Sequence, residues 1–297
     1  MPLSTFDALK QFDSQSLISL TDHQLHQVQK ISLEILDDVI SLCREHGLCW
    51  FLGGGSALGA LRHQGFIPWD DDIDINMPRR DYDRFIPLFR EKYGHRYAVQ
   101  TPQDTPDFAL SMTRIRKKGT VMRGRDDLLL EECGVGLDIF VIENTYDDPI
   151  RRTIHGLGAL GLGFLLSARK FYRDRVVWRQ LLADADQSSF AIRLKIALGA
   201  LVSFHSVDWW CKATDNWHRK CNNHNSQWVC GCAGRLHFFG ELYRRDRFCV
   251  TREATFEGRI VNIPLDAEDY LTHCYGDWQE IPETDKREKH MLFELKL

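Results

Sequence analysis

Four aspartates occupy five consecutive positions of the chain, and this density limits how the surrounding segment can fold. They are Asp70, Asp71, Asp72 and Asp74, in the run Trp-Asp-Asp-Asp-Ile-Asp-Ile that begins at Trp69. Neighbouring carboxylates repel one another strongly unless a cation neutralises them. Alternate residues of a strand share a face, so Asp72 and Asp74 are expected to hold one ion together while Asp71 points away. Magnesium or manganese is the expected ion, because both prefer hard oxygen ligands.

A glycine-rich turn lies upstream of this acidic turn. Residues 48–52 form a short apolar run that predicts a buried strand. Gly54, Gly55 and Ser56 follow it, and their small side chains let a phosphate group approach the backbone N–H groups at the start of the next helix. An acidic cluster by itself is also typical of a solvated loop. Its combination with a phosphate-binding turn favours a metal-dependent phosphoryl-transfer site.

A third acid stands alone in a later apolar run. Asp138 lies between Leu137 and Ile139, where a buried carboxylate without a partner would cost free energy. A metal ion held by Asp72 and Asp74 would be such a partner. Asp138 is therefore expected either to complete the metal site or to accept the proton of an attacking hydroxyl as a general base. A structural acid with an ordinary hydrogen-bonded partner is the alternative.

Helical and extended patterns alternate through the first half of the chain. Thr21 and Gln24 form a capping-box signature, apolar residues then recur at steps of three and four, and Gly47 is placed to end the helix. Helices are expected at about 22–45, 57–62 and 81–93, and strands at 48–52, 73–76, 97–100, 111–116 and 137–142. This mixture predicts an α/β or α+β fold with a mixed sheet.

Two apolar segments, residues 154–168 and 190–210, mark a change of character in the second half. The first is too short to span a bilayer, and charged residues interrupt the second. Both are expected to be helices that cover the core, or a surface that touches the cytoplasmic face of a membrane. Five basic residues between 169 and 179 follow the first segment closely, which suits a membrane surface and also fits a solvated face.

The remaining sequence predicts a strand at 256–264, a helix at 267–275 and an irregular tail. Three parts are expected: a catalytic core at 20–148, a mostly helical insertion at 149–247, and a C-terminal segment at 248–297 that packs back on the core.

Composition excludes some functions. The formal net charge is −4, with 43% hydrophobic and 27% charged residues, and this balance argues against general binding of nucleic acids. The N-terminal residues carry no basic stretch followed by an apolar one, so no secretory signal is expected and the protein is expected in the cytoplasm. Nine cysteines, an odd number, indicate reduced thiols. A hint of zinc comes from Cys221, Cys230 and Cys232 near His218, His224 and His237, although the spacing departs from that of a standard zinc site.

The motifs together resemble known signatures. A glycine–serine turn, an Asp-apolar-Asp pair and a later apolar-Asp-apolar run, in that order, resemble the nucleotidyltransferase fold of the polymerase-beta-like enzymes. The longer segment from Phe51 to Tyr82, with Ile-Pro-Trp-Asp-Asp-Asp-Ile-Asp-Ile at its centre, resembles the hallmark of the LicD family. Runs at 256–264, 270–278 and 282–290 resemble that family's later blocks. One departure from the family pattern shifts the hydroxyl of Ser56 by one or two positions, which leaves its role open.

The LicD resemblance implies a reaction. Such proteins transfer a phospho-alcohol, typically phosphocholine, from a CDP-linked donor to a sugar hydroxyl of a cell-surface polysaccharide such as lipopolysaccharide, teichoic acid or capsule, and release CMP. The similar fukutin-related proteins use a CDP-linked polyol. A transferase of nucleoside monophosphates that uses an NTP is the alternative enzyme. A nucleotide-binding pseudoenzyme is a third reading, against which the intact acidic triad argues.

Several basic residues are candidate substrate contacts. Arg62, on the helix after the glycine turn, is expected to touch phosphate or nucleotide, or to form a salt bridge with the acidic turn. Arg114 and Arg116 alternate as on a strand and would face the transferred phosphate together, unless that strand is a solvated edge. Arg287 and His290, near the C-terminus, are further candidates.

Overall fold

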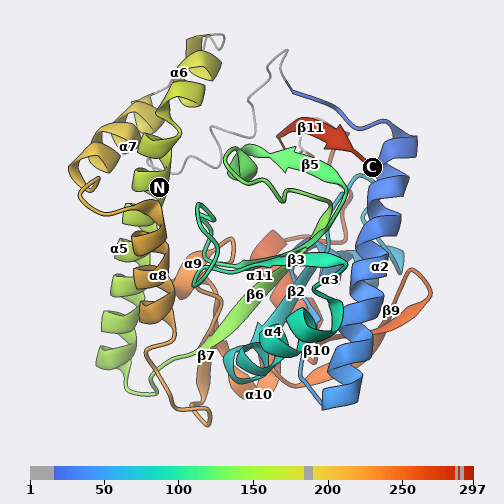
Figure 1. Ribbon diagram of the computed structural model, residues 1–297. Coiled ribbons are helices and arrows are strands. Elements are labelled where there is room, and N and C mark those ends of the chain that lie inside the picture. The colour runs from blue at the N-terminus through green and yellow to red at the C-terminus, as the bar shows by residue number, and fades with distance from the viewer. Residues whose placement is uncertain (1–16, 184–189, 285–286, 288–290) are drawn as a thin grey trace.

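The computed structural model describes residues 17–183, 190–284, 287 and 291–297 (Figure 1). Strands and helices mix as the sequence predicts, and the central sheet is itself mixed. Its strands are β1 (Phe51–Leu52), β2 (Asp74–Pro78), β6 (Gly136–Asn144), β4 (Thr113–Lys117) and β3 (Tyr97–Gln100), in that spatial order. Two short strands, β7 (Trp228–Cys230) and β8 (Leu242–Arg244), extend it beyond β6.

The register of the central strands places three charged residues side by side. β2 and β6 run parallel with Asp74 opposite Asp138, and β4 runs antiparallel to β6 with Arg114 opposite the same Asp138. Three segments far apart in the sequence therefore bring their charges to one line across the sheet.

The first helix, α2 (Asp22–His46), forms with the predicted ends. The Thr21 hydroxyl accepts a hydrogen bond from the Gln24 N–H at 3.3 Å, and Gly47 takes the left-handed conformation with φ of 60°. Its buried stripe packs on β4, β6 and α4 (Arg79–Tyr93). α3 (Gly54–His63) packs on β2 and on α11 (Ala267–Tyr275). These helices hold the acidic turn between the sheet and the C-terminal segment.

A helical group stands at one edge of the molecule, on the left of Figure 1. Its members are α5 (Pro149–Arg173), α6 (Arg175–Ala183), α7 (Phe190–Leu201) and α8 (Val207–His218). α7 and α8 pack along α5, and the short helix α9 (His237–Gly240) joins them. In the described part of the chain, no helix has both the length and the apolarity needed to cross a membrane. The division into three domains stays a prediction.

The C-terminal part differs from the expectation in two ways. The expected strand at 256–264 is a hairpin of β9 (Thr251–Phe256) and β10 (Arg259–Pro264), turned at Gly258, whose φ is 73°. The tail is not irregular throughout, because β11 (Leu292–Lys296) pairs with β5 (Val121–Gly124). A short 3-10 turn, η1 (Arg125–Asp127), and the short helix α10 (Arg245–Phe248) complete the elements. Because β5 and β11 are so distant in sequence, no local pattern predicts that they pair.

Candidate active site

Three aspartates converge at the start of the parallel strand pair. Carboxylate oxygens of Asp72, Asp74 and Asp138 all lie within 4.8 Å of one another. Asp70, Asp71 and Asp72 form a second group, whose carboxylate oxygens also lie within 4.8 Å of one another. The strand begins only at Asp74, so the alternation expected for residues 70–73 does not apply, and Asp71 lies with its neighbours instead of pointing away.

The three converging aspartates suit a small divalent cation. Octahedral Mg²⁺ with ligands at about 2.0–2.1 Å holds adjacent oxygens about 2.9 Å apart. The three carboxylates already place oxygens within 4.8 Å of one another, which is close enough for one small ion to contact them all. Asp138 is buried and Asp72 is half-buried, so the concentrated negative charge lies where water screens it poorly. The residues therefore fit a magnesium or manganese ion.

The glycine turn is fastened to the strand that carries Asp74. The N–H of Gly53 donates to the Asp74 carbonyl at 3.0 Å, and the Asp74 N–H donates to the Ser56 hydroxyl at 2.9 Å. The helix begins at Gly54, three residues earlier than expected, so the glycines themselves form its N-terminus. The role that the sequence left open for Ser56 is here a contact that holds Asp74 in place.

Gly54 and Gly55 lack a Cβ, and each leaves room for the carboxylate of an aspartate. Gly54 has a φ of 47°, and a Cβ at this position would lie 3.0 Å from an oxygen of Asp74. A Cβ on Gly55 would lie 2.9 Å from an oxygen of Asp70. The acidic residues thus approach the backbone at the N-terminus of α3, where the helix dipole favours negative charge.

A Gly54→Ala variant is expected to bind Mn²⁺ at least tenfold more weakly than the wild type, because its methyl group displaces the Asp74 carboxylate. It should also lose about 1–2 kcal/mol of stability, because an alanine is strained at the positive φ of this position. Gly47→Ala is the matched control, since Gly47 has a φ of 60° and nothing within 4 Å of an added Cβ. Isothermal titration with Mn²⁺ and thermal unfolding separate the two effects. Equal Mn²⁺ affinity in both variants would contradict the argument.

Asp138 has an arginine partner that joins it to a buried ionic cluster. Arg114 Nε donates to both oxygens of Asp138, at 2.9 and 3.1 Å. Its Nη1 lies 3.4 Å from Asp127, to which Arg116 also donates at 2.7 Å. Burial opposes the charge of Arg114, but Asp138 and Asp127 outweigh it and raise the pKa of Arg114. β4 lies inside the sheet, so the alternative of a solvated edge strand is wrong.

The other basic candidates lie along the C-terminal segment. Arg62 donates to the carbonyls of Trp278 and Glu280, at 2.6 and 3.1 Å, which directs its side chain to the C-terminal segment. Its contact with phosphate or nucleotide stays a prediction. Arg287 lies over the ring of Trp69, 4.0 Å from its centroid, which brings the segment beside the acidic turn. His290 lies outside the described residues.

Two tyrosines of α11 were not predicted as part of the site. The N–H of Gly54 donates to the Tyr270 hydroxyl at 2.9 Å. The Tyr275 hydroxyl lies 3.5 Å from the Cβ position of Gly54, and burial, then the Asp74 carboxylate, raises the pKa of Tyr275. Both tyrosines belong to a run that resembles the LicD family, which was the only available signal.

The described structure does not support the zinc site suggested by Cys221, Cys230 and Cys232. Cys230 and Cys232 place their sulfurs 3.5 Å apart, and Cys221 is buried. Within the ranges that the structure describes, the groups of three or more converging ligands are the two aspartate groups, and no cysteine belongs to either.

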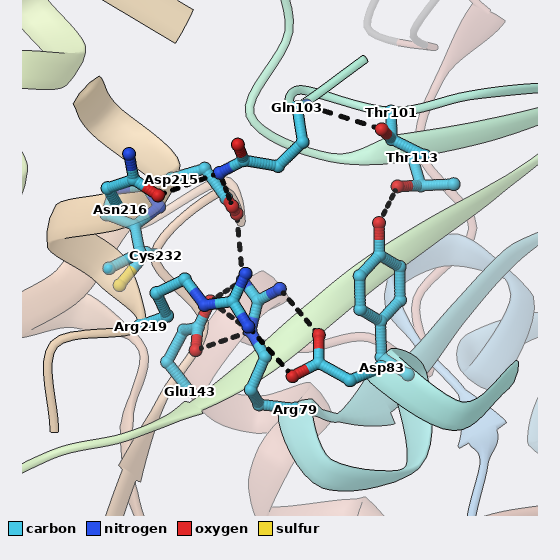
Figure 2. A network of polar contacts seen from close by, with 12 residues as sticks. Arg79, Asp83, Thr101, Gln103, Thr113, Glu143, Asp215, Asn216, Arg219 and Cys232 are labelled. Atoms are coloured by element: carbon cyan, nitrogen blue, oxygen red, sulfur yellow. Dashed lines mark hydrogen bonds and ion pairs between the residues drawn. The ribbon is translucent and has the colours of Figure 1, made fainter. Parts of the chain in front are cut away.

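A second set of buried charges lies at the far end of the same two strands (Figure 2). Arg79, just after β2, donates through Nε to Glu143 of β6 at 3.0 Å and through Nη2 to Asp215 of α8 at 2.8 Å. Burial raises the pKa of Glu143, whereas Arg79 and Gln103 outweigh burial at Asp215 and lower its pKa. This ionic network ties the helical group to the sheet.

Comparison with known proteins shows which proteins the chain is similar to. Residues 47–119 match the model of the LicD/FKTN/FKRP nucleotidyltransferase domain. The chain is 26% identical, over 91% of its length, to the lipopolysaccharide cholinephosphotransferase LicD of Haemophilus influenzae, 97% of which the match covers. Uncharacterized proteins of Rickettsia typhi and Rickettsia prowazekii are each 30% identical, over 23% and 25% of this chain and 24% and 31% of their own lengths. Together with the resemblance at Phe51–Tyr82, these matches show that the chain is similar to LicD-family proteins, at residues 47–119 by the family model and along most of its length by the Haemophilus relative.

Proposed function

We propose that this protein is a transferase that moves a phospho-alcohol, phosphocholine above all, from a CDP-alcohol to a hydroxyl of a cell-surface glycan such as lipopolysaccharide. The observation that carries the proposal is the convergence of Asp72, Asp74 and Asp138 beside a glycine turn. The Haemophilus relative, whose name states cholinephosphotransfer to lipopolysaccharide, supports the group and the acceptor. The CDP donor and the release of CMP come from the LicD resemblance. We further propose a nucleotidyltransferase-type core.

The residues of the site have distinct roles in this proposal. Asp72 and Asp74 would hold the metal, and Gly55 and Ser56 offer backbone N–H groups to phosphate, whereas the Gly54 N–H already donates to the Tyr270 hydroxyl. Magnesium, when bound, supplies charge neutralisation to the pyrophosphate and to the leaving CMP. Arg114 fixes the orientation of Asp138, as partners of metal-binding carboxylates do.

The reaction itself is a displacement at phosphorus. The acceptor oxygen forms a bond to the β-phosphorus while the bond from that phosphorus to the oxygen of CMP breaks, and CMP departs with the electron pair. Asp138 accepts the proton of the acceptor hydroxyl, or, if it would instead complete the metal site, that proton passes to solvent water.

A ligand screen tests the donor. CDP-choline is expected to raise the melting temperature more than CDP-ethanolamine, CDP-glycerol or CDP-ribitol, and only with Mg²⁺, because a ligand that binds the native state alone stabilises it. The chosen donor should then yield free CMP when the glycan is added. A labelled nucleotide from ATP or CTP on the product would instead support the nucleotide transferase. No shift with any CDP-alcohol, in protein that still binds Mn²⁺, would overturn the donor class.

A further inference from the structure

The helical group carries an unusual share of exposed apolar side chains. Among the described residues, half of the exposed large hydrophobic residues, eight of sixteen, come from residues 149–210. They are Ile150, Ile154, Leu157, Val176, Phe190, Leu201, Phe204 and Trp209. Single exposed apolar residues are ordinary on protein surfaces, but a gathering of them marks a surface that binds something.

The strongest part of this surface is the outer face of α7. Phe190, Leu201 and Phe204 are 71%, 73% and 70% exposed, and their spacing places them on one side of α7 and of the turn that follows it. The opposite side packs inward, where Gly199 lies against the backbone of Ala168 in α5. Figure 1 shows α7 at the outer edge of the molecule, with no other element beyond it. The apolar side therefore faces solvent.

Positive charge accompanies the apolar residues. Arg193 lies on the same side of α7, and Lys212 follows Trp209 by one turn of α8; both are exposed. Within the described parts of the chain, neither has a carboxylate at ion-pair distance, whereas the exposed Arg247 is paired with Asp266. Residues 149–212 hold ten basic and four acidic residues, a balance of +6 in a chain whose net charge is −4.

We propose that the outer face of α7, with Trp209 and Lys212, docks the protein on an anionic lipid surface. Aromatic and aliphatic side chains flanked by Lys and Arg are the composition of helices that lie in the membrane interface. Trp209 is already held flat against His205, with ring centroids 3.7 Å apart, so little side-chain freedom is lost on docking. The inference goes beyond the proposed transfer reaction, because it uses none of the residues of that site.

Sedimentation with vesicles tests the docking surface. The full chain should bind vesicles of phosphatidylcholine with 30% phosphatidylglycerol, bind pure phosphatidylcholine far more weakly, and release as salt rises from 50 to 500 mM. The variants Leu201→Ser/Phe204→Ser and Arg193→Glu/Lys212→Glu should each weaken binding at least tenfold, since one removes apolar contacts and the other reverses two charges.

Matched controls lie elsewhere on the surface. Ile260→Ser, at a position 56% exposed on β10, and Arg247→Glu should bind vesicles like the wild type. Circular dichroism confirms folding, and CMP release from soluble substrates should be unchanged in all variants. The proposal is overturned if the wild type ignores anionic vesicles, or if the Leu201/Phe204 variant binds them equally well. It is also overturned if that variant converts a dimer to a monomer while vesicle binding is absent, which would make the face an interface between copies.

Discussion

An Asp74→Asn variant is expected to lose CMP release by a factor on the order of 1,000 or more while its fold persists. The exchange removes one of three converging carboxylates, and a bound metal ion contributes several kcal/mol to stabilising charge in phosphoryl transfer. Asp72→Asn should behave alike. Initial rates of CMP release at saturating Mg²⁺, with Mn²⁺ affinity by calorimetry, measure the effect.

Two further exchanges sharpen this test. Asp71→Asn should reduce CMP release much less, because Asp71 converges with Asp70 and Asp72 but not with Asp74 and Asp138. Asp138→Asn separates the two roles proposed for Asp138. If Asp138 is a metal ligand, the variant should bind Mn²⁺ more weakly. If Asp138 is the general base, the variant should lose turnover but keep its Mn²⁺ affinity. Near-wild-type CMP release by the Asp74→Asn variant would refute the assignment of the metal site to Asp72, Asp74 and Asp138. If Asp71→Asn lost CMP release to the same extent as Asp74→Asn, the metal site would have to be assigned to residues 70–72.

Replacing Arg79 with methionine is expected to destabilise the protein by about 3–5 kcal/mol, the largest change in stability that we predict. The exchange leaves Glu143 and Asp215 buried without their cation, and breaking a buried ion pair from one side costs this much. Arg219→Met is the matched control in the same network (Figure 2). Arg219 and Asp83 are about 40% exposed, so their ion pair contributes at most about 1 kcal/mol.

The loss of stability in the Arg79→Met variant should depend on pH. Without Arg79, burial raises the pKa of Glu143 and Asp215 in the folded state above their values in the unfolded chain. Such groups cost stability increasingly as pH rises from the unfolded pKa toward the folded one, so the defect should be larger at pH 7.5 than at pH 5. Urea denaturation of both variants at the two pH values measures this. A defect that does not change with pH would mean that lost packing, and not uncompensated charge, is responsible.

Local patterns account for the parts of the structure that the sequence predicts well. The capping box at Thr21 and the glycine at Gly47 define α2 because each acts within one turn of its own helix. The aspartates at 72 and 74 are two residues apart, so any extended or turning backbone keeps them close. The mixed sheet follows from alternating apolar runs.

What the sequence does not predict depends on strand register and on distant contacts. Arg114 and Asp138 were each singled out, but only the antiparallel register of β4 and β6 makes them partners. Tyr270 reaches Gly54 across 216 positions, and Arg62 reaches Trp278 across the same separation. No local period records such contacts, because tertiary packing of the C-terminal segment creates them.

The way the C-terminal segment closes around the glycine turn has a consequence for how the protein is made. A chain emerging from the ribosome can form α2, α3 and β2 early, but the Tyr270 hydroxyl that accepts from Gly54, and the β11 strand that pairs with β5, are synthesised last. At 5–20 residues per second, roughly 10–45 s separate Asp74 from residue 296. The site of a growing chain therefore stays incomplete through most of translation, and the protein acquires the full set of contacts around the glycine turn only near the moment of release.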